Sequence, residues 1–436
     1  MRSLQLGAYD HMFRNVIESY TGYVQVQHED FKDNPTVDNV IEYSSEIREV
    51  LMKDKNVIDA VPRFESFSLA SSGALTKGVL VMGIDPEKES LLSNVKGRLV
   101  KYKLSEQAIL DLKKSDLPEA GKSKLEFFKE ESYSSSGIIQ LDLGIRDADS
   151  ATLMPIIRKS ALFNNGYFSS EKKEALIGSK LARYLKLNIG DTIVLIGQGY
   201  HGSTAAGKYR ISGIVRMPTP DIDNKIVYLP VDVCQDLYSA PGMLTSLALS
   251  IKDNSDKEIV KMIQSISKEI PSPQRLIEWR EMNALLINQM EADNMSGVIM
   301  VGILYLVIAF GIFGTVLMMT VERKREFGVL VAIGMQKSKL AAIVSFEMFY
   351  IGLLGILSGI AVAFPAIVIG QNNPIRFLGE YAKIYESYGM EPVMPFMPVD
   401  YYFFWQSVIV AIIVGIAVIY PVRKIYKMKL VNSLKA

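Results

Sequence analysis

Two short runs of this 436-residue sequence carry the glycines and lysine of a phosphate-binding loop, in which backbone N–H groups and a lysine hold phosphate oxygens. After the first run, residues 202–208, stands Tyr209, where a Ser or Thr hydroxyl would hold magnesium. That run also leads into a predicted strand, whereas a phosphate-binding loop opens a helix. The second run, residues 120–123, has Asp116 in place of the first glycine. We therefore reject both and expect no nucleotide site in this chain.

Other residues that could carry chemistry are sparse. The histidines, His11, His28 and His201, are far apart and lack metal-ligand spacing. Cys234 is the single cysteine, so no disulfide can form within the chain. No nucleophile–base pair or metal cluster is apparent before the apolar segments. We therefore expect no catalytic residue and no metal site. The net charge of +1 also argues against a nucleic-acid partner.

Charge is concentrated in a short run, residues 322–334, that lies between two apolar segments. Residues 297–321 and 348–370 carry no charged side chain, and each is longer than the roughly 20 residues that a helix needs to cross a bilayer. The run opens with mixed charges at Glu322, Arg323, Lys324, Arg325 and Glu326. Its second half repeats apolar side chains at helical spacing, at Phe327, Leu330, Val331 and Ile333. The sequence therefore predicts a short amphipathic helix at a membrane surface, with charges available to a partner.

The lysines and arginines beside the apolar segments indicate how the chain is oriented, because cytoplasmic loops carry an excess of them. A third apolar segment covers residues 402–420. The loop 322–339 and the tail 421–436 are rich in Lys and Arg, whereas the loop 371–401 contains only Arg376 and Lys383. We therefore expect a multi-pass membrane protein. Its two basic segments lie in the cytoplasm, and the long region before the first span lies outside.

That long region is predicted to be a large α+β domain. Residues 1–20 read as an amphipathic helix and residues 21–281 as the domain itself. Residues 96–136 are charged and read as a mobile insertion or linker, with a second unit starting at Gly137. Residues 282–321 are predicted to form a linker helix that runs without a break into the first span. The second span is expected at 340–370.

The predicted elements of the domain follow from periodicity and turn residues. Strands are expected at 22–28, 60–70, 75–84, 174–177, 191–198, 208–215, 226–229, 247–252 and 274–279. Helices are expected at 37–55 (capped by Thr36 or Asp38), 105–114, 179–185 and 256–270.

The second span contains two features that are unusual in an apolar helix. Gly352, Gly355 and Gly359 share nearly one face, where small residues let helices approach closely. We predict a packing interface there, within the subunit or with a second subunit. Glu347 is the acid of this span, and we expect it near the cytoplasmic interface, paired with an Arg or Lys of the 322–339 loop. Pro365 could kink the helix.

The 322–334 run resembles the cytoplasmic coupling segment of a family of ABC transporter permeases. The family includes the lipoprotein-releasing permeases (LolC/LolE-type), the macrolide exporter MacB and the cell-division permease FtsX. Its E-R-x-R-E-x-G-x-L-x-A-x-G pattern is filled at Glu322, Arg323, Arg325, Glu326, Gly328, Leu330, Ala332 and Gly334. The resemblance is looser at residues 177–182, at the Gly190-Asp191 turn and at Tyr420–Lys424, after which Leu430 and Lys435 depart from the family pattern.

The resemblance implies that these residues, with Phe327, dock on a cytoplasmic ABC ATPase dimer that binds ATP and Mg, so no cofactor is expected in this chain. It implies a non-catalytic subunit of the bacterial inner membrane that works by mechanotransmission with a second permease subunit, in a homodimer or a heterodimer. Lipoprotein release is the favoured role, with a lipoprotein or a periplasmic carrier as partner beside membrane lipid. The alternatives are MacB-like efflux of small molecules or peptides and FtsX-like regulation of a cell-wall hydrolase.

The family also has a transmembrane helix just before an amphipathic helix like residues 1–20. Because a domain of this size must be exported, we expect a fourth span upstream of Met1, absent through truncation or a misassigned start.

Overall fold

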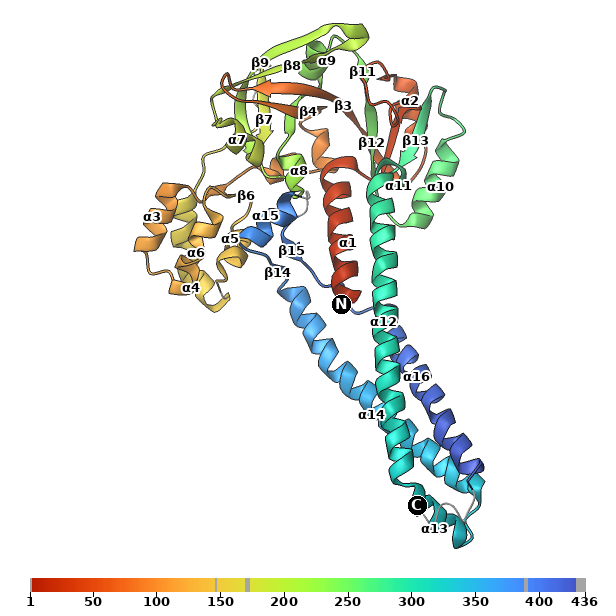
Figure 1. The fold of residues 1–436 in the computed structure, drawn as a ribbon. Coiled ribbons are helices and arrows are strands. Elements are labelled where there is room, and N and C mark those ends of the chain that lie inside the picture. Colours follow the sequence, from red (N-terminus) through yellow and green to blue (C-terminus); the bar gives the residue numbers. More distant parts are fainter. Residues whose placement is uncertain (1, 146, 169–172, 388–390, 429–436) are drawn as a thin grey trace. The chain divides into compact units, whose positions relative to one another are not determined.

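The computed structural model describes residues 2–145, 147–168, 173–387 and 391–428 (Figure 1). The chain divides into two compact units. The outer unit comprises His11–Ala284 and Arg376–Val393, and the membrane unit comprises Met1–Asp10, Leu285–Ile375 and Met394–Ala436. Leu430 and Lys435, where the tail departs from the family pattern, lie outside the described residues.

The outer unit contains a four-stranded antiparallel sheet covered by two helices. Its elements are β1 (Val24–His28), α2 (Ser45–Leu51), β3 (Val57–Ser71), β12 (Ser246–Ile251), α10 (Asp256–Ile266) and β13 (Gln274–Glu278). The strands pair in the order β13-β1-β12-β3, which with the two helices is the β-α-β-β-α-β arrangement of a ferredoxin-like unit. Leu51 of α2 and Ile259 and Met262 of α10 are buried with Val26 and Leu247 of the sheet. One face of each strand therefore packs on the helices, as side-chain alternation requires.

Strand β3 extends beyond β12 into a closed barrel. The further strands are β4 (Thr76–Ile84), β7 (Glu174–Gly178), β8 (Thr192–Gln198), β9 (Thr204–Val215) and β10 (Ile226–Pro230). β8 pairs back onto the end of β3, with Ser68 opposite Gly197, so the ring β3-β4-β10-β7-β9-β8 closes. The core of this part includes Phe64, Ile177 and Leu195. Around it lie α7 (Ser179–Leu185), α8 (Pro220–Asp223), α9 (Val231–Leu237) and the pair β2 (Ile41–Glu42) and β11 (Met243–Leu244).

A helical subdomain is inserted between β4 and β7. It consists of β5 (Tyr102–Lys103), α3 (Glu106–Lys114), α4 (Glu119–Lys122), the 3-10 turn η4 (Leu125–Phe128), β6 (Ser132–Tyr133), α5 (Ser136–Leu143) and α6 (Asp147–Ala161). Its own core contains Leu104, Leu112, Leu125, Ile139 and Ile157. Residues 96–136, which we expected to be a mobile insertion or linker with a second unit from Gly137, thus contribute to one packed subdomain that continues past Gly137. The abundant charges hid apolar residues that are far apart in sequence and meet only in three dimensions.

Most predicted strands of the outer unit are confirmed, and one predicted helix is wrong in its bounds. Residues 37–55 do not form one helix, because Ile41–Glu42 pair as β2 and α2 starts at Ser45. The cap is Ser44, whose Oγ accepts a hydrogen bond from the Ile47 N–H at 3.3 Å, and neither Thr36 nor Asp38 serves. The predicted helices at 105–114, 179–185 and 256–270 appear as α3, α7 and α10, with α10 ending at Ile266.

The remaining short elements connect these parts. They are α1 (Arg2–Val16), its π-helical continuation η1 (Ile17–Thr21), the 3-10 turns η2 (Lys88–Leu91), η3 (Val95–Arg98) and η5 (Tyr200–Gly202), α11 (Trp279–Met282), β14 (Ile375–Arg376), α15 (Glu380–Ser387) and β15 (Val393–Met394). The loop predicted at 371–401 thus carries short structured elements, and its part from Arg376 to Val393 belongs to the outer unit.

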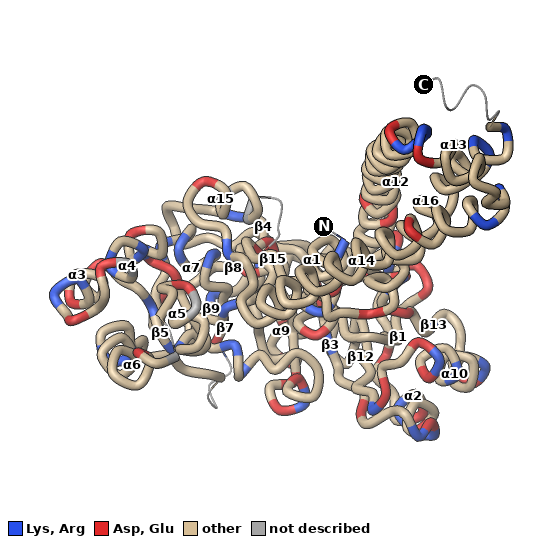
Figure 2. The backbone as a smooth tube through the Cα atoms, turned by 90° about the horizontal axis from the view of Figure 1, so that it is seen from below, with Lys and Arg blue, Asp and Glu red and all other residues tan. Residues whose placement is uncertain are grey.

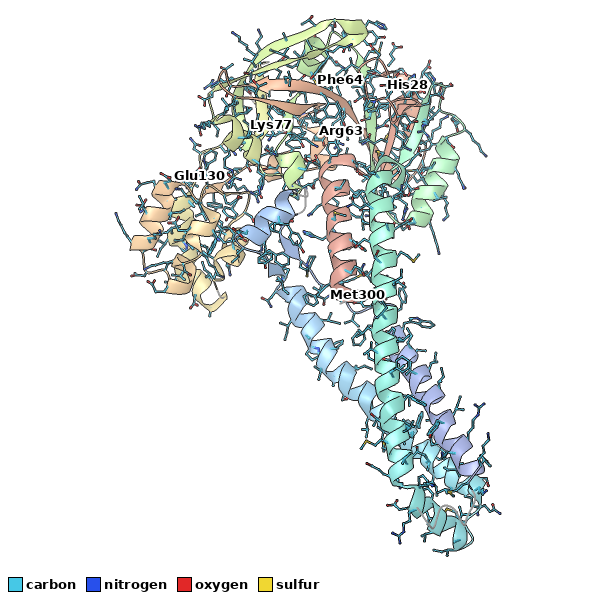
Figure 3. All side chains as sticks on the ribbon, viewed as in Figure 1. His28, Arg63, Phe64, Lys77, Glu130 and Met300 are labelled. Atoms are coloured by element: carbon cyan, nitrogen blue, oxygen red, sulfur yellow. The ribbon has the colours of Figure 1, made fainter. Side chains whose placement is uncertain are left out.

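The membrane unit contains three helices that are long and apolar enough to cross a membrane among the described residues: α12 (Ala284–Glu322), α14 (Lys337–Asn372) and α16 (Tyr401–Tyr426). The 39 residues of α12 join the predicted linker and the first span into one helix. Along α12, apolar side chains such as Met300 project outward (Figure 3), as expected for contact with lipid. The short helix α13 (Lys324–Ala332) connects α12 to α14.

Candidate functional site

The coupling segment, residues 322–334, is a short helix bounded by two backbone turns. Arg323 leaves helical geometry with a ψ of 6°, which separates α12 from α13. Gly334 has a φ of 108°, a conformation that side-chain-bearing residues rarely adopt, and it allows the turn into α14. The turn therefore favours glycine at position 334, which is one of the positions of the family pattern. The two turns hold α13 as a separate element between two long helices.

The apolar face of α13 is packed inside the membrane unit. Phe327 is only 4% exposed and lies in a cluster with Leu340 and Val344 of α14 and Ile425 of α16. Gly328 beside it is also buried. Burying a phenylalanine contributes roughly 1.5–3 kcal/mol. Phe327 and Gly328, which we predicted to be coupling residues, are thus buried on the inner side of α13. Phe327 packs there against α14 and α16.

An ion pair fixes the start of the segment. The Arg323 guanidinium donates to both carboxylate oxygens of Glu347 on α14, at 2.7 and 2.6 Å, and also to Glu326 at 3.1 Å. These hydrogen bonds to Glu347 and Glu326 raise the pKa of Arg323. The predicted pairing of Glu347 with a cation of the loop is confirmed. The charge of Arg323 is therefore paired with carboxylates of the same chain.

The remaining charges of the segment face outward. Glu322, Arg325 and Glu326 are exposed, and so are Leu330 and Ile333 on the same short helix. Figure 2 shows acidic and basic residues gathered around α13, while the adjoining spans are largely uncharged. A rigidly seated helix that presents mixed charge and two apolar side chains can bind a complementary groove on another protein. The predicted set thus separates into an outward group and an inward group.

Lys337 makes a contact beside the coupling segment that the sequence did not predict. Its Nζ donates to the backbone carbonyls of Tyr426 and Met428, at 3.2 and 2.8 Å. A lysine commonly satisfies the last carbonyls of a helix. Lys337 therefore ties the start of α14 to the end of α16. Nothing in its sequence position predicts this pairing, because the two residues lie far apart in the chain.

The three glycines of α14 do not share one role. A Cβ placed on Gly352 would lie 2.9 Å from Val414 of α16, so this glycine permits the close packing of the two helices. A Cβ on Gly355 or Gly359 would meet nothing within 4 Å. Only Gly352 of the predicted interface is thus occupied within the subunit, and the face of the other two lies open.

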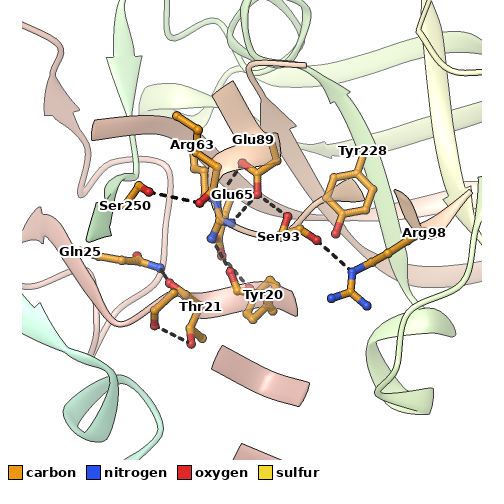
Figure 4. A network of polar contacts seen from close by, with 12 residues as sticks. Tyr20, Thr21, Gln25, Arg63, Glu65, Glu89, Ser93, Arg98, Tyr228 and Ser250 are labelled. Atoms are coloured by element: carbon orange, nitrogen blue, oxygen red, sulfur yellow. Dashed lines mark hydrogen bonds and ion pairs between the residues drawn. The ribbon is translucent and has the colours of Figure 1, made fainter. Parts of the chain in front are cut away.

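A second polar site lies in the outer unit, where the π-helical turn after α1 meets β3 (Figure 4). Arg63 and Glu89 are 1% and 0% exposed and bond through Nη2–Oε1 at 2.5 Å and Nε–Oε2 at 3.2 Å. Arg63 Nη1 also donates to the Tyr20 carbonyl, and the Tyr20 hydroxyl donates to Glu65 at 2.7 Å. Burial raises the pKa of the Glu65 carboxyl. We name Tyr20, Arg63, Glu65 and Glu89 the anchor cluster.

The prediction that residues 202–208 lead into a strand is confirmed. Lys208 lies within β9, so residues 202–208 form a turn into a strand and not the start of a helix. The described part of the chain holds no group of three or more His, Cys, Asp or Glu that could bind a metal ion.

Comparisons with known proteins add family information. Residues 298–430 match the model of the FtsX-like permease C-terminal family. A curated relative, an uncharacterized ABC transporter permease of Methanocaldococcus jannaschii, is 25% identical over 203 residues, which are 44% of this chain and 47% of the relative. The chain thus spans about half the length of that relative.

Two solved structures are similar to this chain at low scores. The periplasmic region of MacB from Actinobacillus actinomycetemcomitans aligns with a TM-score of 0.32 and 11% identity, over 64% of this chain and 98% of that one. The extracellular domain of the ABC-type transporter YknZ from Gram-positive bacteria aligns with a TM-score of 0.29 and 10% identity, over 59% of this chain and 100% of that one.

Proposed function

We propose that this chain is an ABC transporter permease of the FtsX and MacB type, since residues 298–430 match the FtsX-like permease family, and that it couples ATP hydrolysis on a separate ATPase to movement of its outer unit. The observation that carries this proposal is the seating of α13. Phe327 and Arg323 lock the helix to α14 and α16, so a displacement of α13 is passed directly to two spans.

The outward residues of the coupling segment are the proposed contact with the ATPase. Glu322, Arg325 and Glu326 supply the charges, and Leu330 supplies an apolar contact. In this proposal ATP and Mg bind to the partner, which is a cytoplasmic dimer, and two permease subunits share it. The open face of Gly355 and Gly359 on α14 is a candidate contact with the second permease or with lipid. The chain itself supplies no catalytic residue.

For the role of the complex we propose release of lipoproteins from the inner membrane, with the outer unit on the periplasmic side. The large outer unit, His11–Ala284 with Arg376–Val393, supports a role in handling cargo outside the membrane. Efflux of small molecules or peptides and control of a cell-wall hydrolase are the competing outcomes. A release assay with a labelled lipoprotein, run beside an efflux assay on the same vesicles, separates them.

The test of coupling is a charge reversal that leaves the seat intact. Glu322→Lys with Arg325→Glu inverts two exposed side chains that lie outside the Phe327 cluster and outside the hydrogen bonds of Arg323 with Glu347 and Glu326. Opposed charges across an interface cost several kcal/mol, so the variant should lose the ATP hydrolysis that copurifies with the wild-type chain from its native membrane. A matched control reverses Glu258 and Lys261, an exposed pair on α10. Equal copurified hydrolysis in both variants, or none with the wild-type chain, contradicts the proposal.

A further inference from the structure

The outer unit contains a cavity of about 610 Å³ whose walls come from three distant parts of the chain. One wall is the helical subdomain around η4, and the second is formed by α7 and the end of β9. The third is formed by residues 376–382 and 391–393, and we call the described residues 376–387 and 391–393 the strap. Cavities that bind small molecules commonly measure roughly 300–1,000 Å³. The size alone therefore permits a small organic ligand.

Polar contacts fasten the strap to other parts of the outer unit, so this wall of the cavity is held in place. Arg376 pairs with Asp142 of the helical subdomain, and that carboxylate is only 6% exposed. At the other end, Glu391 bonds to His11 at 2.8 Å and to Asn15 at 3.2 Å, both on α1. Within the strap, the ring of Phe377 stacks on another aromatic side chain. The strap continues directly into α14 and α16 along the chain.

At one wall of the cavity, two arginine guanidinium groups donate hydrogen bonds to the same carboxylate. Glu131 accepts hydrogen bonds from Arg216 and, at 3.3 Å, from Arg183. Burial would raise the pKa of Glu131, but Arg216, Arg183 and the nearby Lys180 together lower it to about 2. The carboxylate is therefore ionised at neutral pH and neutralises one of the two arginines. One positive charge is left over at this wall.

Most of the other charged side chains around the cavity have polar partners of their own. Arg376 is paired with Asp142, and Glu391 bonds to His11, which balances the charge of Glu391 only when the imidazole is protonated. At the edge of the cavity, Lys129 pairs with Glu106, Glu126 pairs with Lys113, and Glu380 is exposed on the first turn of α15. The excess of positive charge is therefore local to the Arg183–Arg216 wall, and the acids Glu380 and Glu391 lie elsewhere on the lining.

Apolar side chains face the same cavity. Phe127 is 59% exposed although it belongs to the helical subdomain, whose other aromatic and aliphatic side chains are mostly packed. Phe128, Phe377 and Val393 also line the cavity. Together these side chains give the cavity an apolar surface on which an aromatic group can stack.

We propose that this cavity binds an organic monoanion, a carboxylate attached to an aromatic body. The carboxylate pairs with the outward donors of Arg183, whose guanidinium offers more N–H groups than Glu131 uses. The aromatic body lies against Phe127 and Phe377. Because the strap is both a wall of the cavity and the link between α14 and α16, a ligand bound there holds the strap to the helical subdomain. This site is independent of the proposed ATPase contact.

The test uses the full chain in nanodiscs, without any ATPase, so that its failure leaves the proposed coupling function untouched. The probe is 3-phenylpropionate, and its amide is the uncharged control, with empty nanodiscs correcting for partition into lipid. Isothermal titration calorimetry should show the acid binding at least tenfold tighter than the amide. Equal affinity of acid and amide, or no heat from the acid beyond that of empty nanodiscs, overturns the proposal.

Two variants place the binding at this wall. Arg183→Gln should weaken binding at least tenfold, whereas Arg48→Gln should leave it unchanged. The control is closely matched, because Arg48 is also about half exposed and bonds to one carboxylate, that of Asp59, at 3.3 Å. Phe127→Ala removes an exposed ring that the fold does not need and should weaken binding severalfold. Unchanged affinity in Arg183→Gln, or an equal loss in Arg48→Gln, contradicts the assignment.

Discussion

The coupling segment and the anchor cluster are both built on one arginine and one glutamate, but they bury these groups to opposite degrees. In the coupling segment, the side chains of Arg323 and Glu347 are 39% and 34% exposed. In the anchor cluster, Arg63 and Glu89 are 1% and 0% exposed. Exposed pairs contribute about 0–1 kcal/mol, whereas removing one partner of a buried pair costs roughly 3–5 kcal/mol. The difference indicates that the Arg323–Glu347 pair can break and re-form at low cost, whereas the Arg63–Glu89 pair stays closed.

The largest expected effect is at the anchor cluster. Glu89→Gln leaves the Arg63 guanidinium buried without its counter-charge and should destabilise the outer unit by about 3–5 kcal/mol. Trp279 lies in the outer unit and Trp405 in α16, so a Trp405→Phe background leaves one fluorophore that reports the outer unit alone. Urea unfolding followed by Trp279 fluorescence measures the change. Glu258→Gln, at an exposed position on α10, is the control, and equal shifts in the two variants would remove the contrast between the two pairs.

The second effect is at the seat of the coupling segment. Phe327→Ala opens a cavity among Leu340, Val344 and Ile425 and should cost about 3 kcal/mol, at the low end for a buried phenylalanine. A nitroxide label at Ile333→Cys, in a Cys234→Ser background, should become much more mobile because α13 loses its main apolar contact. Leu330→Ala removes a half-exposed side chain of the same helix and should change the electron paramagnetic resonance spectrum of the label little. Similar spectra for both variants would mean that Phe327 does not seat α13.

The third effect is a pH dependence of stability that arises at Glu131, in the wall of the cavity, and not at either of the two arginine–glutamate pairs. The pKa of Glu131 is about 2 in the folded protein, below the ordinary glutamate value of 4.5. The stability from this depressed pKa is fully present above about pH 4.5 and is lost as the pH falls through 2. The loss should reach at most about 3 kcal/mol, at 1.36 kcal/mol per unit. Urea midpoints from Trp279 fluorescence between pH 5 and 2 should fall less in Glu131→Gln than in wild type, and parallel curves would contradict this.

The sequence predicted most strands from their alternation and all three apolar spans from the length of their uncharged runs, and both features are local. It missed the helical subdomain for the opposite reason: Leu104, Leu125 and Ile157 become one core only after the chain folds back on itself. The barrel closure between β3 and β8 is likewise a long-range pairing, and no local pattern encodes it.

The candidate site was predicted as a set of residues but not as two faces. Glu322, Arg325 and Glu326 point outward as a partner contact requires, whereas Arg323 and Phe327 are held by α14 and α16. Helical spacing placed Phe327 on the apolar face, but spacing cannot say whether another protein or the chain's own spans cover that face. The strap was missed because residues 376–387 and 391–393 are short of periodic structure, and their contacts with Asp142 and His11 join residues far apart in sequence.

The smallest expected effect, at the exposed Arg323–Glu347 pair, decides the comparison. Glu347→Gln should cost about 1 kcal/mol or less, since Phe327 still holds α13 in place, and the label at Ile333→Cys should become only slightly more mobile. If water reaches the pair, salt screens it, so raising the ionic strength from 0.05 to 0.5 M should mobilise the label in wild type and leave Glu347→Gln unaffected. The buried anchor pair should not respond to salt in the Trp279 assay. A wild-type label that ignores salt, combined with a large effect of Glu347→Gln, would mean that lipid covers the pair. The pair would then behave like the buried one, and the coupling segment would have no ion pair that can break and re-form at low cost.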